Sequence, residues 1–173
     1  MSIKDTVVKQ LQEYLEKDGI SFSSSSTDVI EFEVTVQNIN LEFTVFSSDL
    51  FTVSYTLVPL NISQENLEII YKLMNYLNSN TPFGNFEYDL SASSLYYRIS
   101  LVLEERGVTY EIYDHLLNYP LFTIETYMPF LNGVNSGLLS LEDAITKIDA
   151  LIEIPPEDQE TKPEISAALP AAS

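Results

Sequence analysis

The sequence predicts an α+β domain with a five-stranded, mainly antiparallel sheet and helices packed on one of its faces. Three observations support this fold class. Residues 84–107 read as a β-hairpin, because two segments that alternate apolar and polar side chains flank a short Ser/Ala run. Three further segments between residues 30 and 57 alternate in the same way. Stretches with apolar residues at helical spacing precede, separate and follow the strands.

The chain begins with a predicted amphipathic helix over residues 3–18, in which apolar residues recur at helical spacing. Gly19 suits the left-handed position just past a helix end. Residues 22–27, FSSSST, are interpreted as a polar loop. The first strand of the sheet is therefore expected to begin near residue 30.

A three-strand meander follows this loop. A two-residue turn at residues 37–38 pairs Val36 with Ile39 and keeps the apolar side chains of the first two strands on one face. The third strand ends at Pro59, and its apolar side chains are expected on the same face. The predicted core face of the meander consists of Ile30, Phe32, Val34, Val36, Ile39, Leu41, Phe43, Val45, Phe51, Val53, Tyr55 and Leu57.

The central hairpin is expected to pair Leu90 with Leu95 across the Ser/Ala turn, which keeps its apolar side chains on one face. The same register puts Glu87 opposite Arg98 on the other face, as an opposite-charge pair. The predicted core face of the hairpin consists of Phe86, Tyr88, Leu90, Leu95, Tyr97, Ile99 and Leu101.

Helices are predicted on both sides of this hairpin. One carries apolar residues at helical spacing between residues 67 and 77. After the hairpin, Thr109 can cap a helix that Pro120 ends, and Pro129 is expected to kink or restart the next helical stretch. Ser140 has the spacing of a capping box at the start of the last helix. The order is therefore helix, three-strand meander, helix, two-strand hairpin and C-terminal helices.

The predicted domain covers residues 1–152. Residues 153–173 form an acidic segment that is rich in Pro and Ala and lacks aromatic side chains. Such a composition is typical of a disordered tail.

Charge and composition limit the kinds of partner. Twenty-six acidic residues against eight basic ones give the 173-residue chain a net charge of −18. Phosphate backbones and anionic membranes are bound through Lys/Arg clusters, so neither a nucleic acid nor a membrane is an expected partner. The absence of cysteine fits a reducing compartment, and a cytoplasmic location is expected.

The sequence offers little for catalysis, a cofactor or a metal. The one histidine, His115, follows Asp114 in a predicted helix, and adjacent helical residues do not face each other. One histidine without cysteine excludes ordinary zinc sites, and the five glycines form no phosphate-binding loop. No catalytic, cofactor-binding or metal-binding residue is therefore assigned. The alternatives are an enzyme that uses surface carboxylates or His115, and a structural subunit of a larger assembly.

Loose motifs in the second half of the chain resemble those of a known family. A strand of the form G-x-F-x-x-D precedes a strand with a Y-R core, and a P-x-L helix and an S-x-E-x-A helix start follow. Together with the order of elements, they resemble the YbjN-domain branch of the type III secretion chaperone-like superfamily, over roughly residues 1–152. The positions that carry the resemblance are Gly84, Phe86, Asp89, Tyr97, Arg98, Pro129, Leu131, Ser140, Glu142 and Ala144.

The resemblance implies a non-enzymatic protein that binds other proteins. Secretion chaperones of this fold are usually homodimers that hold partner segments in extended form on apolar patches, and YbjN-type proteins are described as regulators. A chaperone-like or regulatory domain is therefore expected, with another protein or a second copy of the chain as its partner.

One candidate surface lies on the polar face of the central hairpin. Tyr96, Arg98 and Val102 fall on this face, and an aromatic, an arginine and an aliphatic side chain on an otherwise polar face are typical of an interface. These three residues are the predicted partner-binding site.

Overall fold

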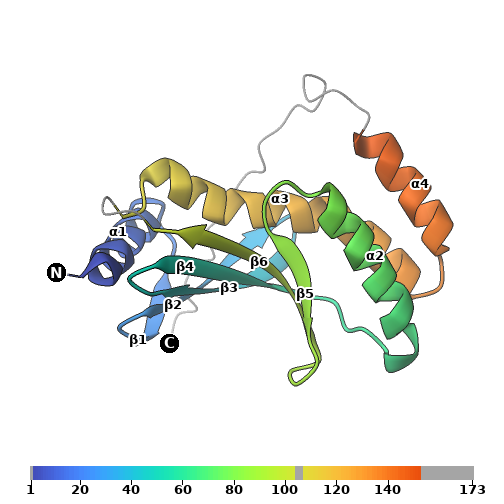
Figure 1. Ribbon diagram of the computed structural model, residues 1–173, viewed down its shortest axis with the longest axis horizontal. Helices are drawn as coiled ribbons and strands as arrows, with labels where there is room; N and C mark the ends of the chain where they lie inside the picture. Colours follow the sequence, from blue (N-terminus) through green and yellow to red (C-terminus); the bar gives the residue numbers. More distant parts are fainter. Residues whose placement is uncertain (1, 104–106, 153–173) are drawn as a thin grey trace.

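A six-stranded antiparallel sheet with four α-helices on one side forms the computed structural model, which describes residues 2–103 and 107–152 (Figure 1). The strand order is β1-β2-β3-β4-β6-β5, so the hairpin joins the meander where β6 pairs with β4. The elements in chain order are α1 (Ile3–Lys17), β1 (Phe22–Ser26), β2 (Val29–Val36), β3 (Ile39–Ser47), β4 (Phe51–Val58), the 3₁₀ turn η1 (Gln64–Asn66), α2 (Leu67–Asn80), β5 (Asn85–Asp89), β6 (Ser94–Val102), α3 (Tyr110–Asn135) and α4 (Leu141–Ile152).

The sixth strand is β1, which the sequence predicted as a polar loop. Only Phe22 of this strand is partly buried, where it pairs with Phe32, and the four serines are exposed. β1 pairs with β2 on one side only, and its register shifts between Ser23 and Ser26. The expected number of five strands is therefore wrong. An edge strand can form backbone hydrogen bonds without an alternating apolar pattern, so the sequence pattern did not reveal β1.

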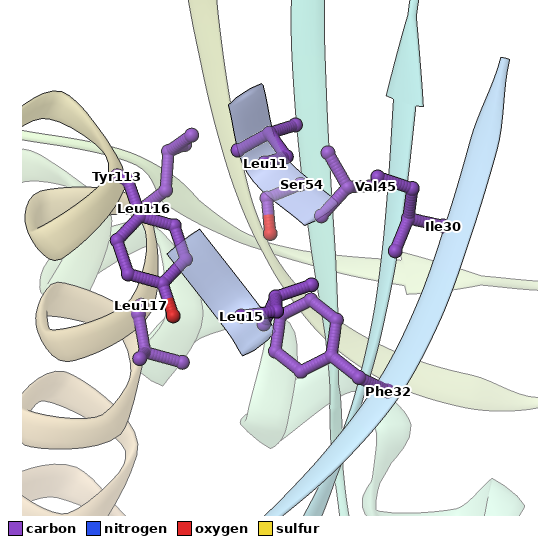
Figure 2. A pocket seen from close by; sticks show the side chains of 9 residues that line it. All are labelled: Leu11, Leu15, Ile30, Phe32, Val45, Ser54, Tyr113, Leu116 and Leu117. Carbon is purple, nitrogen blue, oxygen red and sulfur yellow. The ribbon is translucent and has the colours of Figure 1, made fainter. Parts of the chain in front are cut away.

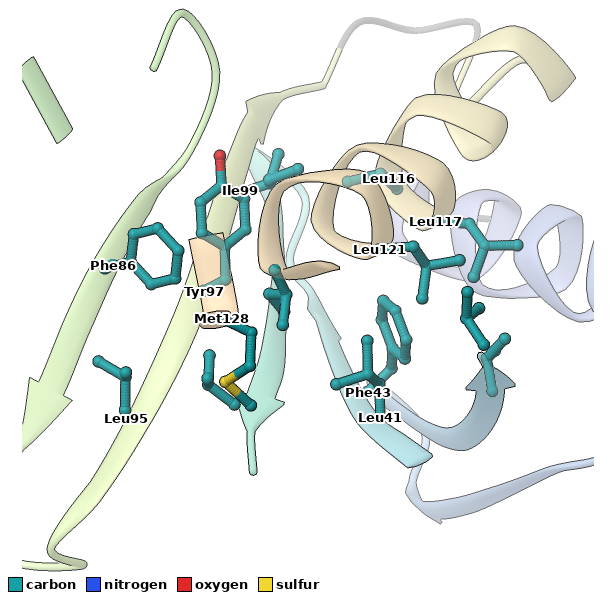
Figure 3. Packing of buried hydrophobic residues seen from close by; sticks show 14 of the residues in the cluster. Leu41, Phe43, Phe86, Leu95, Tyr97, Ile99, Leu116, Leu117, Leu121 and Met128 are labelled. Carbon is teal, nitrogen blue, oxygen red and sulfur yellow. The ribbon is translucent and has the colours of Figure 1, made fainter. Parts of the chain in front are cut away.

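The four helices pack against one face of the sheet and enclose the core. α3 crosses the sheet and contacts β4 and β6, α1 lies against β2 and β3, and α4 packs on α2 and α3 (Figure 1). Side chains of α3, such as Leu121 and Met128, reach the strands, and Phe86 meets Tyr97 edge-to-face with ring centroids 5.0 Å apart (Figure 3). The side chains buried most completely include Tyr97, Phe43, Phe86, Leu15, Ile30, Ile70, Leu73, Leu77, Leu95, Leu121, Ile124 and Leu131.

α3 runs without interruption from Tyr110 to Asn135, so the expectation that Pro120 ends a helix is wrong. The hydroxyl of Thr109 caps this helix, as expected, by accepting from the backbone N–H of Ile112. A proline inside a helix costs about 3 kcal/mol. Burial of a large apolar side chain stabilises by about 1.5–3 kcal/mol, and eight of the ten residues that α3 buries are of this kind, so packing outweighs the cost of its prolines.

The central hairpin has the expected faces but a register shifted by two residues. Phe86 lies opposite Tyr97 and Tyr88 opposite Leu95, whereas Leu90 is exposed in the turn. The turn is fixed by Asp89, whose Oδ1 accepts from the backbone N–H groups two and three residues on, at 2.7 and 3.1 Å. A shift of two keeps every side chain on its face, because side chains alternate with a period of two.

From Phe51 to Leu57, β4 presents its small hydroxyl side chains to the helices and its large side chains to the other side, whereas Val58 at its end lies in the core. Thr52, Ser54 and Thr56 are buried, and Ser54 pairs with the core residue Val45. The expected core face of this strand is therefore wrong. The residues expected in the core but found on the opposite face are Phe51, Val53, Tyr55 and Leu57.

The loop between β3 and β4 determines which face of β4 is covered. Ser47 pairs with Thr52, and the Oγ atom of Ser48 accepts from the backbone N–H groups of Leu50 and Phe51 at 3.2 and 3.1 Å. This local hydrogen bonding closes a loop of residues 48–51. Since one residue more or fewer in the pairing exchanges the two faces of a strand, the loop places the apolar set of β4 outward.

Candidate protein-binding face

The sheet face away from the helices, termed the open face, carries an unusual number of large side chains. No helix among residues 2–103 and 107–152 covers it (Figure 1). β4 and β6 pair Phe51 with Val102 and Tyr55 with Arg98 on this face. The open face consists of Val29, Glu31, Glu33, Thr35, Asn40, Glu42, Thr44, Phe46, Phe51, Val53, Tyr55, Leu57, Asn85, Glu87, Asp89, Tyr96, Arg98, Ser100 and Val102.

One end of the open face is apolar. This apolar end consists of Phe46, Phe51, Val53 and Val102. Phe46 and Phe51 lie with ring centroids 6.1 Å apart, and Val53 is only 4% exposed on this uncovered side of the sheet. Phe51 and Val102 remain 40% and 88% exposed. Contiguous exposed apolar side chains of this kind are typical of an interaction site.

The other end of the open face combines aromatic rings with carboxylates around a hollow of about 500 Å³. This aromatic–acidic hollow is lined by Thr44, Tyr55, Glu87, Tyr88, Asp89 and Tyr96. The rings of Tyr55 and Tyr96 meet edge-to-face with centroids 6.2 Å apart. Tyr88 lies opposite the core residue Leu95, so its side chain is on the helix side of the sheet, where its ring meets Tyr71 of α2 edge-to-face with centroids 5.9 Å apart.

An ion pair lies beside the hollow. The Nη1 atom of Arg98 donates to Oε1 of Glu87 at 3.0 Å, and the guanidinium carbon lies 5.9 Å from the centroid of the Tyr55 ring. The hydrogen bond to Glu87 raises the pKa of the Arg98 guanidinium, so this group stays charged. The expected pair of opposite charges is present. Glu87 reaches Arg98 diagonally, because the residue directly opposite Arg98 on β5 is Asn85.

Two of the three predicted partner-binding residues lie together. Tyr96 and Arg98 both adjoin the aromatic–acidic hollow, whereas Val102 belongs to the apolar end, about 20 Å from Tyr96 along β6 at about 3.3 Å per residue. The sequence reasoning missed the outward residues of β4. The signal that could have found them is the alternation of β4, because every second residue from Thr52 to Thr56 carries a small hydroxyl side chain that fits in the core.

His115 and the neighbouring Asp114 do not pair with each other. His115 is exposed on α3, and the Asp114 carboxylate accepts instead from Asn118 Nδ2 at 2.6 Å. Within the described residues, no group of three or more His, Asp or Glu side chains could hold a metal ion. Across the same part of the chain, no helix combines the length and apolar character that crossing a membrane requires.

A second space lies inside the core, between α1, α3 and strands β2 to β4. Figure 2 shows Ser54 in it among Leu11, Leu15 and Val45, all pointing toward the same space. Its volume is about 10 Å³, which is close to the space of one water molecule. This cavity is too small for a ligand, so the open face is the candidate functional site.

Comparison with known proteins gives the family of the chain. The family model named YbjN, "Putative bacterial sensory transduction regulator", matches residues 8–132. The chain belongs to the YbjN family. The crystal structure of YbjN from E. coli, titled "a putative transcription regulator", has a similar fold, with a TM-score of 0.52 and 13% sequence identity. The similarity covers 84% of this chain and 93% of the E. coli chain. No curated protein matches the sequence significantly.

The YbjN match contains the whole candidate site. Residues 8–132 extend from α1 into α3 and include all six described strands, whereas α4 lies beyond the match. The open face is therefore built entirely from the part of the chain that defines this YbjN-family protein.

Proposed function

We propose that this YbjN-family chain is a non-enzymatic, chaperone-like regulatory domain that binds a segment of a partner protein on its open face. The observation that supports this function best is the orientation of β4, whose apolar side chains lie on the uncovered side while its hydroxyl side chains lie in the core. Leaving Phe51 and Val102 in water is unfavourable by about 25 cal/mol for each Å² of apolar surface, and a bound partner would recover this free energy.

The proposed site extends the three residues expected from the sequence. Tyr96, Arg98 and Val102 form its β6 side, and Phe51 and Tyr55 form its β4 side. Aromatic and arginine side chains are enriched at the centres of protein interfaces. The family description as a regulator is compatible with such a role. The resemblance to secretion chaperones and the cytoplasmic location belong to the same proposal, as does a domain that spans residues 1–152.

The test uses peptides that are selected for binding to the purified chain. A display library of random 12-residue peptides is panned against the wild type, and the affinities of the selected peptides are then measured for two variants. Val102→Asp places a charge at the apolar end, whereas Leu138→Asp changes an equally exposed leucine, 87% exposed in the turn after α3. We expect at least tenfold weaker binding by Val102→Asp, or about 1.4 kcal/mol, and unchanged binding by Leu138→Asp.

A second copy of the chain is the other partner that the face could accept. Sedimentation velocity of the wild type distinguishes this case, because a dimer that uses the open face would dissociate in Val102→Asp and persist in Leu138→Asp. The double substitution Tyr96→Ala with Arg98→Ala tests the opposite end of the face in the same assays. Equal peptide binding and equal association by all variants would contradict the proposed function.

A further inference from the structure

We propose that the aromatic–acidic hollow receives the guanidinium group of an arginine side chain carried by the partner segment. This inference rests on the proposed function and names the chemistry of the partner. It concerns the end of the open face where Tyr55, Tyr96 and Asp89 meet, and it is independent of what occupies the apolar end.

The size and lining of the hollow fit a flat organic cation. Its volume of about 500 Å³ lies within the usual range of about 300–1,000 Å³ for ligand sites. Two of its lining residues, Tyr55 and Tyr96, are tyrosines of the open face, and a cation near the face of an aromatic ring is attracted by the negative face of that ring. Guanidinium is planar and weakly hydrated, so it stacks on aromatic rings more readily than an ammonium group does.

The carboxylate of Asp89 is available for such a cation. Its Oδ1 atom accepts from Ser91 N, Ser91 Oγ and Ala92 N at 2.7, 2.7 and 3.1 Å, so all three bonds end on one oxygen. These hydrogen bonds, led by the one from the Ser91 hydroxyl, hold the pKa of Asp89 below its usual range. The charge at the rim therefore persists across the physiological pH range.

Arg98 lies beside the hollow and sets its charge balance. This side chain already places its guanidinium near the Tyr55 ring and bonds Glu87. It is the only basic residue in the six described strands, where five acidic residues share the open face. Arg98 balances Glu87 and leaves Asp89 without a balancing positive charge among these strands. With a net charge of −18 on the chain, a basic partner is also attracted from a distance.

The position of the apolar end suggests a probe. Tyr55 lies four positions after Phe51 along β4, which is about 13 Å at about 3.3 Å per residue. An extended peptide with leucine and arginine four positions apart spans this distance. The probe is the capped peptide Leu-Thr-Thr-Thr-Arg, and its control replaces arginine with citrulline, which has nearly the same shape but no charge.

The experiment follows backbone amide shifts by NMR while each peptide is added to the full chain. We expect the arginine peptide to shift the amides of Tyr96 and Asp89, with at least fivefold tighter binding than the citrulline peptide. Asp89→Asn keeps the turn, because an amide oxygen can accept the same hydrogen bonds, and should abolish the fivefold difference. Glu16→Gln makes the same change of charge on the exposed surface of α1 and should preserve it.

Three results would overturn the inference. They are equal binding of the two peptides by the wild type, shifts confined to residues away from the hollow, and a fivefold difference that survives in Asp89→Asn. None of them affects the library experiment with Val102→Asp, which uses the apolar end. A failure of the arginine site can therefore be distinguished from a failure of the proposed function.

Discussion

The hydroxyl side chains that β4 buries differ in how their hydrogen bonds are satisfied. Ser47 and Thr52 share a hydrogen bond of 3.0 Å between their hydroxyl oxygens. The hydroxyls of Ser54 and Thr56 are buried without a hydrogen-bond partner among the described residues. A buried hydroxyl without a partner costs about 1–3 kcal/mol by mutational measurement. The orientation of β4 therefore has a cost on both faces of the sheet. It leaves apolar side chains in water on the open face and hydroxyls without partners in the core.

This difference predicts opposite effects for two substitutions of the same type. Thr56→Val removes a hydroxyl without a partner and keeps the shape of the side chain, so the free energy of unfolding should rise by about 1 kcal/mol. Thr52→Val leaves the Ser47 hydroxyl without its partner, and the free energy of unfolding should fall by about 1–2 kcal/mol. Urea denaturation followed by circular dichroism measures both. Effects of the same sign would contradict this account of the strand.

At the scale of elements, the entry to the central hairpin depends on a close contact of the backbone. Gly84 has φ +71°, and a Cβ atom there would lie 2.7 Å from the backbone oxygen of Arg98 and 2.8 Å from the Tyr97 ring. Tyr97 is fully buried, and its hydroxyl donates to the backbone oxygen of Phe83. Strand β5 can therefore approach β6 only if residue 84 has no side chain.

We expect Gly84→Ala to cost well over 2 kcal/mol of folding stability, because it adds a steric clash to an unfavourable backbone conformation. Gly19→Ala is the matched control. Gly19 has the same φ of +71° with no atom within 4 Å of the added Cβ, so only the conformational cost of about 1–2 kcal/mol applies. Thermal and urea denaturation of the two variants give the comparison. Equal losses would show that the contact with Tyr97 is not limiting.

The last helix is attached through a titratable hydrogen bond. The Tyr76 hydroxyl of α2 donates to the Asp149 carboxylate of α4, and this bond raises the pKa of Tyr76 to about 12. A raised pKa in the folded state stabilises the fold fully below the unfolded value near 10, and this stabilisation is lost as the pH rises toward 12. Tyr76→Phe should therefore be less stable than the wild type at pH 9, and the difference should shrink by pH 11.5. Urea midpoints at both pH values test this, and a constant difference would contradict it.

The two halves of the sheet show what a sequence can and cannot determine. The faces of β2 and β3 follow from their alternation and from the turn at Gln37 and Asn38, whose φ values of +47° and +67° suit the expected two-residue hairpin. The face of β4 does not follow, because both of its residue sets suit a strand and only the Ser48 loop selects one. Tyr96 and Arg98 could be predicted as neighbours on the open face, whereas Tyr55 could not be placed beside them.

At the scale of the whole molecule, packing determines the structure of two segments that local sequence patterns do not predict. β1 is a strand because β2 offers its free edge, and α3 remains one helix because the sheet and its neighbouring helices bury one side of it. Neither outcome can be read from a short window of sequence. The order of elements from β2 to β6 nevertheless agrees with the prediction, since it depends on long periodic segments.

The terminal segment, residues 153–173, lies outside the described residues, and the predicted tail there stays a prediction. Its sequence contains no aromatic residue and offers few large apolar side chains for burial. Truncation after Ile152 should therefore change the thermal midpoint by no more than about 2 °C. Differential scanning calorimetry of the truncated and full chains tests this. A larger decrease would show that the segment contributes to the folded domain.

The pairing of β4 with β6 has a consequence for the order in which the chain folds. β2 pairs with β3 across a two-residue turn, whereas residues 51–58 pair with residues 95–102, from which α2 and β5 separate them in the chain. Closing so long a loop costs entropy before its contacts form, so we expect this pairing to form after the transition state. We expect the local hairpin to form early, so that Val34→Ala mainly slows refolding. Ile99→Val should mainly accelerate unfolding, and stopped-flow chevron plots of the two variants would reveal the order of events.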